Sequence, residues 1–214
     1  MSILPLAASA GVNLVNDPDF SQVAVSGSFT TYGVGTMGGW TVSAGSVDLI
    51  GNYWQAPPGG GQSVDMSGNQ NGTISQSITL GAGTYKLTFA ESGNPDGPPS
   101  LKQLLVGLGG APAQEFDYTI GANGRGNMQW ITQTAYFTVS GGNGLLQFQD
   151  ISSGAGFNNP VGPVGTTPWG AVIGNVSLTA VPEPTTVVAG VGALGLVLAS
   201  MARPRRSSVA RIGK

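Results

Sequence analysis

Few side chains in this sequence can do chemistry, and their types exclude most catalytic mechanisms. The chain of 214 residues contains no histidine and no cysteine. Catalysis by an imidazole or a thiolate is therefore excluded, as is a zinc site built from these ligands. The remaining ionisable groups are 10 acidic and 8 basic side chains. Paired carboxylates, which hydrolyse glycosidic bonds when they lie about 5–9.5 Å apart, are the one catalytic option left.

The acids available for such a pair are Asp48, Asp65, Glu91, Asp96, Glu115, Asp117 and Asp150. Asp48 and Asp65 stand in patterns of alternating apolar residues, which predicts that they face outward or cap turns. Asp96 lies in the sequence Asn-Pro-Asp-Gly and fits a turn. We therefore expect no enzyme, and keep a weak glycosidase as an alternative.

Aromatic side chains offer a different chemistry, because sugars pack their C–H groups on exposed rings while polar groups contact the hydroxyls. Tyr53 and Trp54 stand next to the Gly/Pro-rich segment 57–61, and Trp169 stands in a loop pattern at 158–170. Trp40 and Trp130 fall in strand patterns and are predicted to be core. The predicted carbohydrate-binding residues are Tyr53, Trp54 and Trp169, with polar contacts from Asn94, Asp96 and Lys102. Packing in the core or anchoring of loops is the alternative for the three aromatic residues.

The charge distribution limits the classes of partner that the protein can bind. Residues 11–180 contain three basic and nine acidic side chains, a net charge of −6, whereas the last twelve residues contain five basic side chains and no acid. Phosphate backbones bind basic patches, so nucleic acid is a poor partner for the body. We expect a neutral extracellular polysaccharide, bound next to an exposed Trp54.

Two short motifs suggest a metal or a nucleotide. Asn16-Asp17-Pro18-Asp19 offers oxygen ligands for a structural calcium ion, and a turn before Pro18 is the alternative that we favour. The glycine pattern at 33–38 matches the dinucleotide fingerprint, but a strand pattern follows it instead of a helix. We interpret it as a loop, and expect no cofactor.

The elements that position these residues are strands. Apolar residues alternate with polar ones in many short segments, as in Tyr85, Leu87 and Phe89, and segments rich in Gly, Asn and Pro separate them. The turn at 81–83 has the length and composition of a hairpin loop. About ten such strands predict one all-β domain at 11–180, an antiparallel jelly-roll β-sandwich.

The body also resembles a known family. The matching residues are Gly39-Trp40-Thr41-Val42, the segments 45–50 and 63–68, Tyr53-Trp54, Gly93-Asn94-Pro95 and Lys102. In order and spacing they resemble the choice-of-anchor C family of bacterial surface proteins, which is similar to galactose-binding-like domains of plant cell-wall proteins. The resemblance implies a jelly roll similar to carbohydrate-binding modules. One position departs from the family, because Gly174 stands where an aspartate is expected before Asn175.

The segment 181–214 has the features of a sorting signal. Pro182-Glu183-Pro184 precedes an uncharged apolar run at 185–202, and Arg203, Arg205 and Arg206 follow it. Eighteen residues span about 27 Å as a helix, just under the thickness of a bilayer core. The ordered set resembles the PEP-CTERM signal, which implies processing by an exosortase-type membrane enzyme. A buried core helix is the alternative.

An anchored and exported body needs an export signal. Residues 1–10 end in Ala8-Ser9-Ala10, a signal-peptidase pattern, so we interpret them as the remnant of a signal peptide, with an ordinary first strand as the alternative. The arginines after the apolar run predict that the body lies outside the inner membrane. The expected destination is the cell surface or the extracellular matrix.

Overall fold

The computed structural model describes residues 11–152 and 169–182. In this part of the chain the backbone forms strands and no helix. The strands are β1 (Phe29–Met37), β2 (Trp40–Ile50), β3 (Ser63–Asp65), β4 (Thr73–Leu80), β5 (Gly83–Gly93), β6 (Leu101–Leu108), β7 (Gln114–Thr119), β8 (Ile131–Val139), β9 (Gly142–Asp150) and β10 (Ala171–Ala180). No helix able to span a bilayer occurs among the described residues. The segments 1–10 and 185–202, predicted as a signal remnant and a membrane helix, lie outside them.

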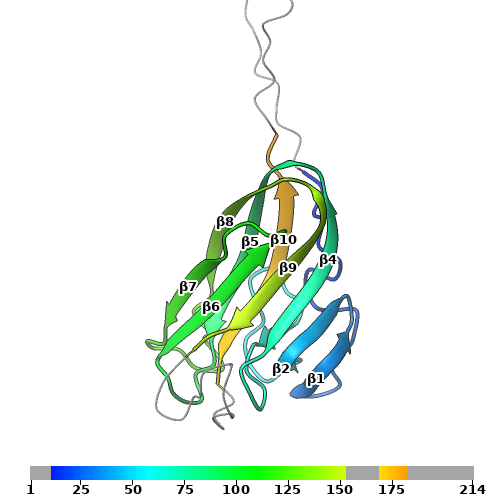
Figure 1. Cartoon of the computed structure of the whole chain (residues 1–214). Coiled ribbons are helices and arrows are strands. Elements are labelled where there is room, and N and C mark those ends of the chain that lie inside the picture. The colour runs from blue at the N-terminus through cyan, green and yellow to red at the C-terminus, as the bar shows by residue number, and fades with distance from the viewer. Residues whose placement is uncertain (1–10, 153–168, 183–214) are drawn as a thin grey trace, which may run out of the picture. The chain divides into compact units, whose positions relative to one another are not determined.

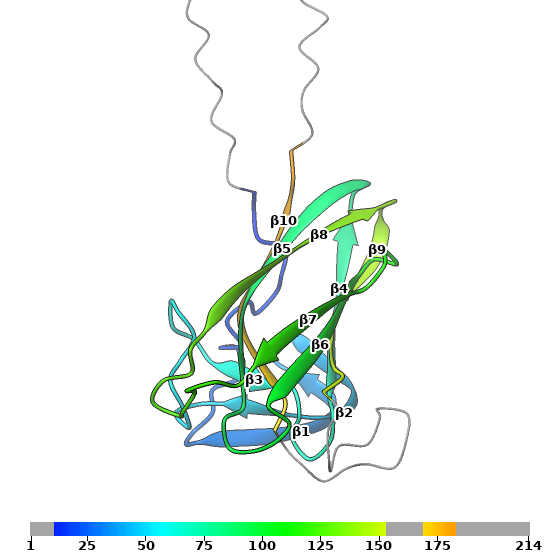
Figure 2. The same ribbon diagram turned by 90° about the vertical axis from the view of Figure 1, so that its left-hand side faces the viewer.

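The strands build a two-layered antiparallel sandwich, which confirms the predicted fold (Figures 1 and 2). The order of hydrogen-bonded neighbours is β7-β6-β9-β4-β2-β3-β10-β5-β8, with β1 paired to β2. One layer contains β7, β6, β9 and β4, and the other contains β3, β10, β5 and β8. At the outer edges, the side-chain amide of Gln114 in β7 donates to the carbonyl of Tyr136 in β8 at 2.8 Å. The sheet therefore nearly closes on itself.

Strand β2 belongs to both layers. Its first half pairs with β4 through Thr41 and Val42, and its last three residues pair with β3. The change occurs around Gly45, whose φ is +62° and whose missing Cβ would lie 2.0 Å from the carbonyl oxygen of Asn71. Only glycine fits both conditions, because other residues strain at this φ and no side chain has room.

The inward-facing residues of the two layers form one core, as the alternating pattern predicts. Leu87 and Phe89 of β5 are buried, as are Leu104 and Val106 of β6 and Phe148 of β9. Trp40 is also buried, and packs against Phe20 and Phe148 with ring centroids 5.4 and 5.9 Å apart. Trp130 is half-buried and packs on a smaller cluster made of Ile50, Trp54, Met128 and Val172.

Two local predictions were wrong. The turn at 81–83 does not close a hairpin, because β4 pairs with β9 and β2, whereas β5 pairs with β10 and β8. The turn instead carries the chain from one layer to the other. Residues 33–37, predicted as a loop, belong to β1, where the register shifts between Gly33 and Gly35. Turn residues indicate that the chain reverses, but do not indicate the layer it enters.

Both ends of the described chain lie at one end of the sandwich. The backbone N–H of Leu14 donates to Leu178 at 2.9 Å, and the side chain of Asn13 donates to Val176 and accepts from Leu178. Strand β10 runs to this end from the opposite one (Figure 1). Its ten residues span about 30 Å at ~3.3 Å each.

The inner face of β5 contains one carboxyl that is buried without full compensation. Glu91 is fully buried, and only its Oε2 accepts a hydrogen bond, from Gln133 at 2.6 Å, with no partner for Oε1 among the described residues. Burial raises the pKa of this carboxyl to about 7. The charged form is therefore costly inside the fold.

We predict that Glu91→Gln stabilises the protein above pH 7. The folded-state pKa is raised, so the favourable contribution of the neutral carboxyl is complete below about pH 4.5 and lost as the pH rises through about 7. A shift of this size corresponds to about 3 kcal/mol. Thermal melting from pH 4 to pH 9 should show the variant more stable at pH 8 and equal to the original chain near pH 4. The exposed Glu115→Gln is the matched control. A variant no more stable at pH 8 contradicts the prediction.

Candidate functional site

A small cavity opens at the end of the sandwich where β5 ends and β10 begins. Its volume is about 110 Å³, and its lining residues are Phe29, Asp48, Ile50, Tyr53, Trp54, Asp65, Asn94, Asp96 and Trp169. Five of these belong to the six residues predicted to bind carbohydrate, all except Lys102. The nine lining residues come from five separate segments, which the layered fold brings together at one end. This cavity is the candidate site, hereafter the end pocket.

Two acids of the end pocket lie opposite each other. Asp48 near the end of β2 pairs in register with Asp65 at the end of β3. Their exposed fractions are 9% and 1%, so the prediction that they face outward into solvent was wrong, whereas Asp65 does cap a turn by accepting from the backbone N–H of Ser67 two residues later. Burial raises the pKa of both carboxyls, and that of Asp65 most. Alternation along β2 and β3 points both acids away from Val47, Leu49 and Val64 of the main core, and the other segments that line the end pocket cover that face.

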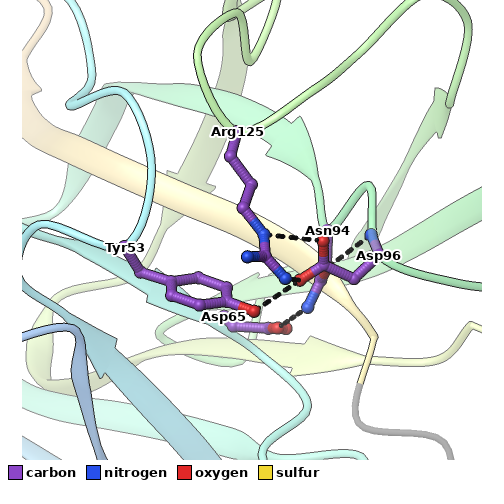
Figure 3. Close-up of polar contacts among 5 residues, drawn as sticks. All are labelled: Tyr53, Asp65, Asn94, Asp96 and Arg125. Atoms are coloured by element: carbon purple, nitrogen blue, oxygen red, sulfur yellow. Dashed lines mark hydrogen bonds and ion pairs between the residues drawn. The ribbon is translucent and has the colours of Figure 1, made fainter.

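Hydrogen bonds hold the Asp65 carboxyl in place. Its Oδ1 accepts from the backbone N–H groups of Ser67 and Gly170, at 3.0 and 3.1 Å. Its Oδ2 accepts from the side-chain amide of Asn94 at 2.6 Å (Figure 3). Asp48 accepts from the hydroxyl of Thr31 at 2.5 Å. The acids therefore offer oxygens in fixed positions, as recognition of hydroxyl groups requires.

The mouth of the end pocket contains an ion pair that the sequence did not reveal. Arg125 donates through Nε and Nη2 to the two carboxylate oxygens of Asp96, at 2.9 and 3.1 Å. The hydroxyl of Tyr53 also donates to Asp96, at 2.9 Å (Figure 3). The Arg125 guanidinium lies 4.2 Å from the centre of the Tyr53 ring. One face of that ring is thus covered, so Tyr53 is a poor platform for stacking.

Trp169 is the half-buried aromatic side chain of the pocket wall. Its six-membered ring lies against Gly97, where an added Cβ would come within 2.0 Å of the ring carbon Cε3. Gly97 ends the Asn-Pro-Asp-Gly turn that also contains Asn94 and Asp96. The turn therefore sets both the polar contacts of the pocket and the place of its tryptophan.

Trp54 lies deeper than the sequence predicted. Its exposed fraction is 6%, it packs with Ile50, Met128 and Val172, and its Nε1 donates to the hydroxyl of Ser63 at 3.0 Å. It is also one of the residues that line the end pocket. The prediction of an exposed ring was wrong, and the alternative of core packing holds for Trp54, because Ile50, Met128 and Val172 pack around it.

Lys102 is also misplaced by the sequence prediction. It is completely buried, and its Nζ donates to the backbone carbonyls of Gly97 and Trp169, at 3.0 and 2.6 Å. It does not line the pocket. Lys102 therefore contacts the two segments that form the pocket, and not a ligand as the sequence predicted.

The calcium candidates use their oxygens within the protein. The Asp17 carboxylate accepts from the backbone N–H groups of Gln22 and Gly39, the Asn16 side chain accepts from Gln22, and the Asp19 side chain accepts from Ser21. A backbone turn spans Asp17 to Phe20, where the N–H of Phe20 donates to the carbonyl of Asp17 at 3.3 Å. No group of three or more acidic side chains suited to a metal occurs among the described residues.

Gly174 has a steric explanation. A Cβ at this position would lie 2.7 Å from Cγ of Pro57, so the aspartate expected from the family resemblance does not fit. Pro57 belongs to the loop at 57–61, which also receives the side-chain hydrogen bond of Asn175 through the carbonyl of Pro58.

The predicted binding residues lacked Arg125 at the mouth of the end pocket and four residues that line it: Phe29, Asp48, Ile50 and Asp65. Arg125 is one of only three basic residues in 11–180, and this scarcity was the one signal available. Its partner Asp96 is 29 residues away. Phe29 packs edge-on against Tyr53, with centroids 5.4 Å apart. Such contacts depend on the tertiary structure alone.

No family model matches the sequence. Halomucin of Haloquadratum walsbyi is 31% identical over 153 residues, which are 71% of this chain and 2% of halomucin. The chain thus spans only a small fraction of the curated relative that it matches.

Several solved structures are similar at low identity. TmCBM61, solved with β-1,4-galactotriose, has a TM-score of 0.49 and 15% identity, and the match covers 79% of this chain and 99% of that one. The CBM22-1 xylan-binding domain of Paenibacillus barcinonensis Xyn10C has a TM-score of 0.42 and 12% identity, covering 83% and 100%. A family 35 module of Clostridium thermocellum has a TM-score of 0.41 and 14% identity, covering 72% and 92%.

We predict that Trp54→Ala destabilises the fold. Removal of a buried aromatic side chain costs about 3–5 kcal/mol and here also leaves Ser63 without its donor. Urea unfolding should show this loss. The control variant Tyr136→Ala should change the free energy of unfolding little, because Tyr136 on β8 is 56% exposed. An unchanged unfolding midpoint for Trp54→Ala would mean that the ring is exposed in solution.

Proposed function

We propose that this chain is an exported bacterial surface or matrix protein whose β-sandwich binds a neutral polysaccharide without cleaving it. The observation that carries the proposal is the end pocket, where the Trp169 ring stands beside fixed carboxyl oxygens. An aromatic wall suits the C–H face of a sugar, and the oxygens of Asp48 and Asp65 suit its hydroxyl groups.

The charges at the end pocket favour a neutral ligand. Asp48, Asp65 and Asp96 line it, and the single cation at its mouth, Arg125, is already paired with Asp96. An anionic sugar would enter a site with excess negative charge and lose solvation. The pocket volume of about 110 Å³ suits part of one sugar unit, so the pocket would hold a chain end or a side branch.

The sorting proposal rests on the sequence of the tail. Pro182-Glu183-Pro184, the apolar run 185–202 and the basic residues after it support export, transient anchoring in the inner membrane and removal by an exosortase-type enzyme. The described chain ends beside Thr84, to which Val181 donates, at the end opposite the end pocket.

We predict that Trp169→Ala weakens polysaccharide binding by about 1–3 kcal/mol, on the scale of burying a large side chain, with little loss of stability. Isothermal titration should use soluble galactan, xylan and β-glucan, with polygalacturonate as the anionic comparison. Tyr136→Ala is the matched control, because it removes an exposed aromatic side chain far from the pocket.

Salt separates the two kinds of ligand. Binding of a neutral glycan should change little between low and moderate salt, since no ion pair carries it. Polygalacturonate binding that strengthens steeply as salt falls contradicts the proposed ligand class. Equal affinities of Trp169→Ala and the original chain contradict the site.

We predict that the surface-derived mature protein ends near Pro184. The last strand of the described residues ends at Ala180, so we expect the sandwich to fold without the tail. Intact mass should show the loss of the residues that follow, and replacing Pro182, Glu183 and Pro184 by alanine should preserve them. A surface-derived chain that still carries Lys214 contradicts processing.

The Asp48–Asp65 pair supports one alternative, slow glycoside hydrolysis. Two carboxyls with raised pKa lie in register on the pocket floor, as an acid and its partner would. Release of reducing ends from a bound polysaccharide, abolished by Asp48→Asn, would favour this function over binding alone. A purely structural or adhesive matrix role would leave every glycan of the panel unbound.

A further inference from the structure

Three buried charges meet behind the end pocket, at the start of β10. The carbonyl of Trp169 accepts from the Lys102 ammonium at 2.6 Å. The N–H of Gly170 donates to Asp65 at 3.1 Å, and the N–H of Ala171 donates to Asp150 at 3.2 Å. Three consecutive residues are therefore each held by a different charged side chain. We call Lys102, Asp65 and Asp150 the charged cradle.

The charged cradle is tightly packed. A Cβ on Gly170 would lie 2.0 Å from Oδ2 of Asp150 and 2.7 Å from Cβ of Ser67. Asp65, Asp150 and Lys102 are at most 1% exposed. Lys102 makes no ion pair within 4.0 Å among the described residues, so its charge stabilises both acids from a longer distance. The side chains cannot exchange their roles without moving the backbone.

Lys102 contacts both segments that position the Trp169 ring. Its Nζ donates to the carbonyl of Trp169 and to that of Gly97, the residue against which the Trp169 ring lies. One ammonium group thus fixes the tryptophan and the surface that supports it. None of its atoms needs to touch a ligand to affect the pocket.

We propose that Lys102 is a positioning residue whose ammonium charge holds Trp169 in the binding geometry, so that protonation of one buried side chain sets the shape of the end pocket. The part of this proposal that concerns the ligand rests on the proposed function. The part that concerns the position of Trp169 rests on the structure alone.

Loss of the proton changes the charged cradle in two ways. A neutral amine still donates to carbonyls, but its hydrogen bonds lose the assistance of the charge, which makes such bonds roughly twice as strong. Asp65 and Asp150 also lose their favourable interaction with the charge of Lys102. Burial lowers the pKa of Lys102 to about 8, with both acids opposing the shift. The change therefore falls just above neutral pH.

The test follows the four tryptophans separately. The full chain is labelled with 5-fluorotryptophan, and the ¹⁹F signal of Trp169 is identified with Trp169→Phe. We expect this signal to shift between pH 7 and pH 9.5 with a midpoint near 8, while the signal of the core residue Trp40 stays constant and reports that the fold is intact. The transition should persist in Glu91→Gln and in Lys86→Met, which exclude the other groups that titrate or carry charge on β5.

Lys102→Met should remove the transition and place the Trp169 signal at a different position even at pH 6.5. If this variant does not fold, the titration of the original chain still decides. No shift near pH 8, or a shift that persists in Lys102→Met, overturns the inference.

Binding is measured in parallel with the galactan, xylan and β-glucan panel. We expect affinity for the glycan that binds to fall at least fivefold between pH 7 and pH 9.5, and not to change over this range in Lys102→Met. A ¹⁹F transition without binding of any glycan would refute the proposed function and leave the positioning role standing. Binding without a transition would refute the positioning role alone.

Discussion

The start of β10 is fixed by buried charges rather than by strand pairing alone, and the end pocket depends on this. Asp65, Asp150 and Lys102 hold residues 169–171 one by one. They add to the backbone hydrogen bond that the N–H of Asn94 donates to the carbonyl of Gly170 at 3.0 Å. Burying three charges is costly, and a protein accepts that cost when an apolar contact cannot give the same direction to backbone groups. A chain with so few charged residues places three of them here.

The fold could be predicted because its main determinant is local. Alternation along β5, as in Leu87 and Phe89, depends on the two-residue period of a strand and is visible without knowing its neighbours. The pairing of strands was not predictable in the same way. The glycine turn at 81–83 has the composition of a hairpin, yet its strands lie in different layers, because only the packing of the whole sheet decides which strands meet. The role of Gly45 in passing β2 between layers depends on Asn71, 26 positions away.

The sequence predicted which residues come together at the site better than it predicted what each of them does there. Aromatic and polar residues near turns predicted five of the residues that line the end pocket. Their roles differed, because exposure is a tertiary property. Trp54 lies under loops, Tyr53 is covered by Arg125, and Lys102 supports the pocket from behind. The sequence could not reveal that Asp48 and Asp65 face each other, since their register is set by the pairing of β2 with β3.

Strand β10 connects the end pocket to the opposite end of the sandwich, and this has a mechanical consequence. A pull applied between a ligand at Trp169 and the chain at Val181 acts along the strand axis. The hydrogen bonds between β10 and β5 lie across that axis from Ala171 to Ala180, interrupted only by the irregularity near Asn175. Because the load enters and leaves on β10 itself, it passes along the covalent backbone of this strand, and these hydrogen bonds are not opened one after another. A strand loaded in this way resists force well, even in a domain of ordinary thermodynamic stability.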